Sequence, residues 1–141
     1  MKKDIITNLK FLREKSIEVS YKEAKKLIKD LEDTLKECHS GIGLSAIQIG
    51  ILKKVGIVRI DELKVNLINP ELIDKQNKFR MRKEGCLSLP SLYIDTIRYN
   101  NITVINNGKE ETYYGIIAVA IQHEIDHING ILITDRVWRK R

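Results

Sequence analysis

The sequence predicts an α+β fold in which short antiparallel or mixed strands pack around a buried helix near the C-terminus. Three observations predict it. An amphipathic helical pattern follows Ser20, β-rich segments with turn residues fill positions 51–114, and an almost uniformly apolar stretch begins after Gly115. A helix that is apolar nearly all round is buried, so we expect strands to enclose it.

The amphipathic helix near the N-terminus is predicted from about residue 21 to residue 38. Ser20-Tyr21-Lys22-Glu23 has the form of a capping box, in which the serine and glutamate side chains satisfy free backbone N–H groups. Apolar residues then follow at helical spacing, at positions 24, 27, 28, 31 and 35. One face of this helix is therefore expected to pack on the core while its lysines face solvent.

Short strands are predicted between positions 51 and 114, because apolar runs alternate there with turn residues. Asn107-Gly108 is a strong hairpin signal, and the polar run Lys75–Lys78 is expected to be the turn of another hairpin. A glycine and a proline in segment 84–90 argue against a central strand, so we expect Cys86 on irregular backbone. The strands expected are Val55–Ile60, Val65–Ile68, Glu71–Asp74, Phe79–Arg82, Ile102–Ile105 and Glu111–Tyr114.

Length and composition predict one globular domain over residues 1–141. No apolar run approaches the length of a membrane span, and Met1-Lys2-Lys3-Asp4 leads into no signal-peptide core, so a cytoplasmic protein is expected. The net charge of +6 is spread along the chain, and no nucleic-acid recognition motif accompanies it. This charge favours only a weak approach to an acidic surface such as ribosomal RNA.

The strongest functional signal is His123-Glu124-Ile125-Asp126-His127. Residues four apart share one helix face, with Cβ atoms about 5–6 Å apart, so His123 and His127 can bind one divalent metal ion. Glu124 can then take a proton from a metal-bound water. Because the chain holds only 3 histidines, two at this spacing with a glutamate between them indicate a metal site.

A third ligand must come from elsewhere in the chain. No glutamate follows Glu124, and position 133, where an extended zinc-peptidase motif would place a histidine, is Ile133. A thiolate ligand would favour Fe(II), Zn(II), Co(II) or Ni(II) over Mg(II) or Ca(II), and three protein ligands leave a fourth position for water. Cys86 is the best candidate, and the alternatives are Cys38, His39 and Asp135.

Three segments resemble the signature motifs of the peptide deformylase family and follow each other in the family's order. They are Gly41-Ile42-Gly43-Leu44-Ser45-Ala46-Ile47-Gln48, Glu84-Gly85-Cys86-Leu87-Ser88 and His123-Glu124-Ile125-Asp126-His127. Ser45 stands where the family usually has alanine. Few residues follow Gly130, so we expect a short form that lacks the family's extended C-terminal helix, as in a bacteriophage-encoded or otherwise minimal member.

The resemblance implies a hydrolase that removes the N-formyl group from the N-terminal formylmethionine of nascent peptides and releases formate. It implies one divalent ion held by Cys86, His123 and His127, with Fe(II) as the usual ion and Zn(II), Ni(II) or Co(II) as other occupants. Metal-bound water would attack the formyl carbon, with Glu124 as general base. The Gln48 side chain and the Leu87 N–H would hold the oxyanion.

The alternative function is another metal-dependent amidase or a metallopeptidase, which would accept unformylated substrates. Ribosome docking in bacterial family members uses the C-terminal helix, so only weak ribosome contact is expected here. The compartment implied is the cytoplasm of a bacterium or of a phage-infected bacterial host.

Substrate-binding residues are expected beside the metal. Gly43 would let the backbone close over the formyl group, and Tyr93 would flank the peptide. Ile42, Val119 and Ala120 are candidates for a methionine pocket, because positions 116, 119, 120 and 123 share one helix face; the alternative is that they are ordinary core residues.

Ligand orientation is expected to depend on Glu84, Arg98 and Asp126. Glu84 and Asp126 each neighbour a ligand in sequence, and a lone buried carboxylate would be costly. The alternative is that all three side chains are solvated.

Overall fold

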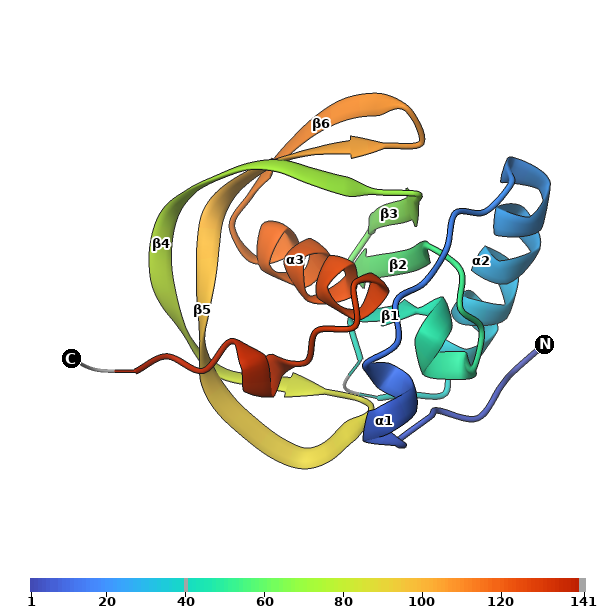
Figure 1. The fold of residues 1–141 in the computed structure, drawn as a ribbon, viewed down its shortest axis with the longest axis horizontal. Helices are drawn as coiled ribbons and strands as arrows, with labels where there is room; N and C mark the ends of the chain where they lie inside the picture. Colours follow the sequence, from blue (N-terminus) through green and yellow to red (C-terminus); the bar gives the residue numbers. More distant parts are fainter. Residues whose placement is uncertain (40, 140–141) are drawn as a thin grey trace.

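Two antiparallel sheets enclose one helix in the computed structural model, which describes residues 1–39 and 41–139 (Figure 1). The first sheet has the order β1-β2-β3, with bounds Gly43–Ser45, Val55–Ile60 and Leu63–Ile68. The second has the order β4-β5-β6, with bounds Glu71–Cys86, Leu89–Asn106 and Lys109–Tyr114. The helices are α1 (Leu9–Leu12), α2 (Tyr21–Leu35) and α3 (Ile116–Ile128), with 3₁₀ turns at Ala46–Ile49 and Ile133–Asp135.

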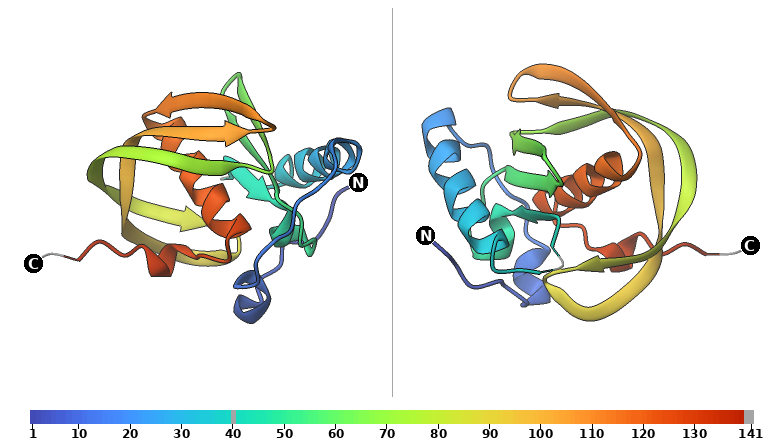
Figure 2. Two further views of the ribbon diagram at one scale, coloured as in Figure 1. Left: turned by 45° about the horizontal axis from the view of Figure 1, so that its top comes forward. Right: turned by 180° about the vertical axis from the view of Figure 1, so that it is seen from behind.

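Helix α3 lies between the two sheets, and α2 covers the far face of the first sheet (Figures 1 and 2). The alternation of β2 explains this arrangement. Ile57 packs in the cluster that holds Leu31 of α2, whereas Val58, on the opposite face, packs in the cluster that holds Ile121 of α3. Both faces of β2 are therefore buried, and the predicted α+β class with an enclosed C-terminal helix is confirmed.

Helix α2 begins where the sequence predicts. The Ser20 hydroxyl accepts a hydrogen bond of 3.2 Å from the Glu23 backbone N–H. The helix ends at Leu35 rather than at residue 38, so Cys38 follows the helix instead of belonging to it. The Cys38 thiol donates to the Thr34 carbonyl, 3.5 Å away.

The predicted hairpin around Asn107-Gly108 is confirmed. Asn107 and Gly108 have φ values of 50° and 79°, the left-handed pair that a tight two-residue turn requires. Strand β2 has the predicted bounds, and β3 begins two residues before Val65. Helix α1 was not predicted, because a single turn of four residues is too short to show a period.

The predicted turn at Lys75–Lys78 is wrong, because β4 runs unbroken through it. Strand β4 pairs with β5 along its length, with Gln76 opposite Asn101 and Lys78 opposite Tyr99. Cross-strand hydrogen bonds satisfy the backbone there, and the polar side chains are exposed. Polarity in this segment therefore reflects a solvated strand surface, and the two expected strands Glu71–Asp74 and Phe79–Arg82 are parts of one.

No helix within the described ranges is both long enough and apolar enough to span a membrane.

Candidate active site

Helix α3 carries both histidines of the site. His127 is 1% exposed, and Val119 and Ala120 on the same helix are also buried. The helix is followed by Gly130 at φ 76°, the left-handed conformation in which glycine commonly ends a helix. A Cβ on Gly130 would lie 2.4 Å from the Arg13 carbonyl oxygen, so the chain passes too close there for any other residue.

Cys86 approaches the histidines from the end of β4. It was expected on irregular backbone, but it is the last residue of the strand and pairs with Leu89 across a two-residue turn. The pairing shifts register between Gly85 and Cys86, and the Tyr93 ring packs on Gly85, where a Cβ would lie 2.7 Å from the ring. Because the strand pairing is irregular here, it accommodates Gly85 and Pro90, the two residues that argued against a strand in this segment.

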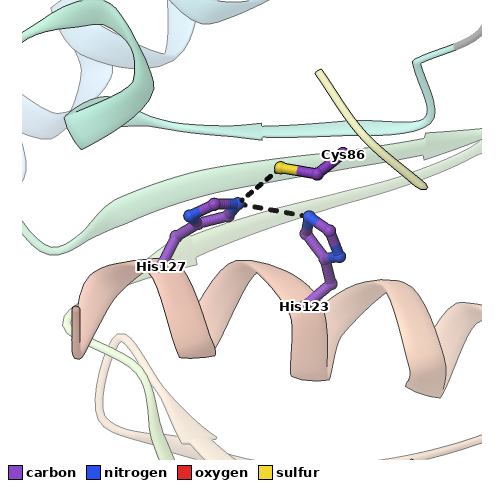
Figure 3. Close-up of side chains that lie close together, drawn as sticks. All are labelled: Cys86, His123 and His127. Carbon is purple, nitrogen blue, oxygen red and sulfur yellow. Dashed lines mark hydrogen bonds between the residues drawn. The ribbon is translucent and has the colours of Figure 1, made fainter. Parts of the chain in front are cut away.

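The three predicted ligands meet in one cluster (Figure 3). His127 Nε2 lies 3.3 Å from Cys86 Sγ and 3.2 Å from His123 Nε2, and all three ligand atoms lie within 4.8 Å of one another. Two nitrogens on a tetrahedral ion with bonds of about 2.0–2.1 Å would be about 3.3–3.4 Å apart. The donor set and its spacing therefore fit one divalent ion.

A buried ionic chain begins at the His123 ring. His123 Nδ1 contacts Glu84 Oε2 at 2.7 Å, which leaves Nε2 facing the cluster. Glu84 accepts two hydrogen bonds from Arg98, of 2.8 Å and 2.6 Å, and one of 2.7 Å from Thr96. Arg98 also donates to Asp126 at 2.7 Å. Arg98 joins Glu84 and Asp126, and all three are buried, so the alternative that these side chains are solvated is excluded. Their role in orienting the ligands stays a prediction.

Burial and neighbouring charges shift the pKa values of Glu84 and His127. Burial opposes ionisation of Glu84, but the hydrogen bonds from Arg98 and His123 hold the pKa of Glu84 well below its usual range. Burial and the nearby His123 lower the pKa of His127 well below its usual value. His127 is therefore a neutral imidazole, the form that binds metal.

Glu124 is 3% exposed and lies beside the cluster. Burial raises the pKa of its carboxyl to about 7. Oxygen Oε1 has no hydrogen-bond partner within residues 1–39 and 41–139. Oxygen Oε2 faces Gly43, where a Cβ would lie only 2.5 Å from it. A buried carboxylate with no hydrogen-bond partner on Oε1 in the described part of the chain and a pKa near neutrality can accept and return a proton.

Gln48 enters the site from the 3₁₀ turn after β1. Its Oε1 accepts hydrogen bonds from the Ser45 N–H at 3.0 Å and the Ser45 hydroxyl at 3.1 Å. Its Nε2 donates to the Ser88 hydroxyl at 3.1 Å and lies 3.8 Å from Cys86 Sγ. The serine that replaces the family's usual alanine therefore helps to direct the Gln48 amide N–H groups toward the cluster.

A pocket of about 430 Å³ opens onto the cluster. The predicted site residues that line it are Ile42, Gly43, Gln48, Cys86, Leu87, Tyr93, Val119, Ala120, His123 and Glu124. Their chemical roles remain predictions. His127 lies behind this lining. The third-ligand alternatives Cys38 and Asp135 do not line the pocket, and Asp135 pairs instead with Arg13 at 2.9 Å.

Sequence reasoning missed several residues of the pocket lining, among them Ile116, Met81 and Lys83. Ile116 shares a helix face with Val119 and Ala120, which was a usable signal. Met81 lies in the expected strand Phe79–Arg82 and Lys83 directly follows it, and no sequence pattern pointed to either as a pocket residue.

The family described as polypeptide deformylase matches residues 3–141 of the sequence. The chain belongs to the polypeptide deformylase family. Peptide deformylase 1 of Bacillus subtilis is 37% identical over 129 residues, which cover 86% of this chain and 79% of that protein. The predicted family, the assignment as an enzyme and the deformylase reaction class are thus confirmed.

Solved deformylase structures share the fold. The crystal structure of peptide deformylase from Thermotoga maritima matches with a TM-score of 0.89 and 30% identity, covering 99% of each chain. A Met-Ala-Ser-bound class I type b peptide deformylase from Acinetobacter baumannii matches with a TM-score of 0.85 and 25% identity, covering 97% of this chain and 99% of that one. Deformylases are metal-dependent hydrolases, which agrees with the Cys86, His123 and His127 cluster.

Proposed function

We propose that this deformylase hydrolyses the formyl amide of N-formylmethionyl nascent peptides with Glu124 as its proton-transfer residue. The observation that carries the proposal is the position of the buried Glu124 beside the Cys86, His123 and His127 cluster, in the lining of the pocket that Cys86 and His123 also line. An amide hydrolase needs these two elements together: an electrophilic centre and a base within reach of it.

Cys86, His123 and His127 would hold one divalent ion. Thiolate and imidazole donors favour Fe(II), Zn(II), Co(II) or Ni(II), and we propose Fe(II) as the native ion. A bound ion supplies Lewis-acid chemistry, activating water and polarising a carbonyl oxygen. Glu84 and Arg98 keep the His123 ring turned so that its Nε2 faces the cluster.

Glu124 would accept the proton of the attacking water and deliver it to the leaving amine nitrogen. Its burial supports both steps, because a pKa of about 7 lets the same carboxyl take up and release a proton near neutral pH. Its position in the pocket lining, beside Cys86 and His123, would bring the carboxyl within reach of the reacting groups.

Gln48 and Leu87 would stabilise the negative charge that develops on the formyl oxygen. Support comes from the Gln48 amide, whose oxygen is fixed by Ser45 so that Nε2 lies 3.8 Å from Cys86 Sγ. Leu87 directly follows the ligand Cys86, so its backbone N–H is carried beside the cluster. Removing one such donor typically lowers turnover by about 10²–10³-fold.

The methionine side chain would lie in the apolar part of the pocket. Val119 and Ala120 are 5% and 4% exposed and line it from α3, while Ile42, at 43% exposed, lines it nearer to solvent. Gly43 lies so close to Glu124 that a Cβ would be 2.5 Å from Oε2, and its backbone would close over the formyl group. Tyr93 is 62% exposed and would flank the peptide as it leaves the pocket.

We also propose that the protein works in the cytoplasm of a bacterium or of a phage-infected bacterial host, where formylated nascent peptides are made. Weak contact with ribosomal RNA would follow from the net charge of +6 and from the exposed lysines of α2. Such contact would weaken as salt concentration rises.

The test is formate release from formyl-Met-Ala-Ser by protein purified and loaded with Fe(II) without oxygen. Wild-type protein should release formate and cleave no internal peptide bond. Glu124→Ala should lose about 10²–10⁴-fold in turnover while keeping its metal, which elemental analysis would measure.

Two results would contradict the proposal. Cleavage of unformylated peptides would indicate another metal amidase or a metallopeptidase. Deformylation by Glu124→Ala at the wild-type rate would show that Glu124 is not the base.

A further inference from the structure

Strand β4 contains a bulge at the mouth of the active-site pocket. Met81 pairs with Thr96, but the next pair is Glu84 with Ile94, so β4 carries one extra residue there. Lys83 lies in this bulge with φ 51°, a left-handed conformation that a long side chain rarely adopts. Bulges beside active sites commonly redirect a side chain.

Asp95 on β5 holds Lys83 in this conformation. The Lys83 N–H donates to Asp95 Oδ1 at 2.9 Å, and the Arg80 guanidinium binds Asp95 Oδ2 at 2.6 Å. A residue in a strained conformation persists only where its surroundings hold it. Three residues on two strands therefore cooperate to fix the position of Lys83.

Lys83 lines the pocket and is exposed. Among residues 1–39 and 41–139, its ammonium group forms no salt bridge. The two carboxylates that line the same pocket, Glu84 and Glu124, are 7% and 3% exposed. Glu84 is also neutralised by Arg98 at 2.6 Å. The mouth of the pocket therefore presents an unbalanced positive charge to an entering peptide.

We infer that Lys83 is a specificity-determining residue that favours substrates with a carboxylate in one of the two residues after formylmethionine. The inference rests on the proposed function, which places the formyl group at the Cys86, His123 and His127 cluster and leads the rest of the peptide out past Tyr93. Lys83 lines the same pocket from the neighbouring strand, two residues before Gly85, which pairs with Tyr93. A substrate carboxylate at this point can form an ion pair with Lys83 while it stays exposed to water, whereas a substrate lysine or arginine is repelled by Lys83.

The experiment measures kcat/KM for amidated formyl tripeptides that carry glutamate, glutamine or lysine at position two or at position three. Wild-type protein should prefer glutamate over its neutral isostere glutamine by about two- to fivefold at one of these positions, the size expected of an exposed ion pair. The preference should shrink in 0.5 M salt, because exposed charges are screened over a few ångströms there (roughly 4 Å).

Lys83→Glu should give the lysine peptide a higher kcat/KM than the glutamate peptide. Lys83→Gln should abolish the difference in kcat/KM between these two peptides. Lys78→Glu is the matched control. Lys78 is an exposed lysine of the same strand that does not line the pocket, so the same change in net charge should leave the order unchanged.

A wild-type enzyme with no glutamate preference at either position overturns the inference, as does a reversal by Lys78→Glu equal to that by Lys83→Glu. Absence of formate release from the glutamine peptides and from formyl-Met-Ala-Ser would contradict the proposed function itself. The two failures are therefore distinguishable.

Discussion

Gly43 lies against the Glu124 carboxyl and the Ile57 carbonyl oxygen, where no side chain would fit. Its Cα lies so close to Glu124 and to the Ile57 carbonyl that a Cβ would be 2.5 Å from Glu124 Oε2 and 3.0 Å from the Ile57 oxygen. The Ile57 oxygen belongs to β2, which pairs with β1, so the backbone cannot retreat without breaking strand pairing. Any added methyl group must therefore displace Glu124.

Gly43→Ala is accordingly expected to lower formate release by at least about tenfold, because even a displacement of about 1 Å of a reacting group can cost 10²-fold in rate. Gly56→Ala is the matched control on the neighbouring strand. A Cβ there would lie 3.5 Å from the Glu124 Cβ, an ordinary contact. Steady-state kinetics of both variants check this, and an equal loss in both would contradict it.

The burial of helix α3 stabilises the hydrophobic core but disfavours the charged form of Glu124. Its enclosure by both sheets provides the core contacts of Ile121 and Ile125. The same enclosure removes water from Glu124, which raises the pKa of that carboxyl to about 7. A carboxyl whose pKa is higher in the folded than in the unfolded chain stabilises the fold when protonated, and this contribution is lost as pH rises through about 7.

Glu124→Gln should therefore stabilise the metal-free protein at pH 8 and have little effect at pH 5. The rise from the usual value of 4.5 to about 7 corresponds to about 3 kcal/mol, or several degrees in Tm for a chain of this size. Thermal unfolding of chelator-treated wild-type and variant protein at the two pH values measures it. A shift of the same size at both values would contradict the assignment of the raised pKa.

Long-range hydrogen bonds of Arg98 join β5 to β4 and α3 and, through Asp126, to the segment that follows α3. Arg98 on β5 binds Glu84 of β4 and Asp126 of α3, and Asp126 also accepts from Arg136 beyond the helix at 2.9 Å. Arg98 is 2% exposed. This chain of charges ends on the His123 ligand, so the packing of both strands and of the last segment determines the orientation of one imidazole.

Arg98→Ala should lower the free energy of unfolding by about 3–5 kcal/mol, because it removes the guanidinium from the buried Glu84 and leaves Asp126 with Arg136 alone. It should also reduce metal content. Arg80→Ala is the control, since its pair with Asp95 is 41% exposed on the arginine side and should contribute at most about 1 kcal/mol. Chemical denaturation and metal analysis measure both effects, and equal costs in the two variants would exclude the proposed role of Arg98.

The sequence by itself determined the features that depend on neighbouring residues. The cap at Ser20, the Asn107-Gly108 turn and the spacing of His123 and His127 all follow from local hydrogen bonding and helical period, and all were predictable. The deformylase motifs added the expectation that Cys86, rather than another residue, completes the ligand set.

Only the tertiary structure decided features that depend on partners far away in the chain. It brings Cys86 Sγ to 3.3 Å from His127 Nε2, while the Cys38 thiol donates to Thr34. It also extends β4 through a polar segment and directs Lys83 to the pocket, because cross-strand pairing with β5 satisfies the backbone whatever the side chains are. Pairing partners are chosen by the packing of the whole chain, and no local pattern records that choice.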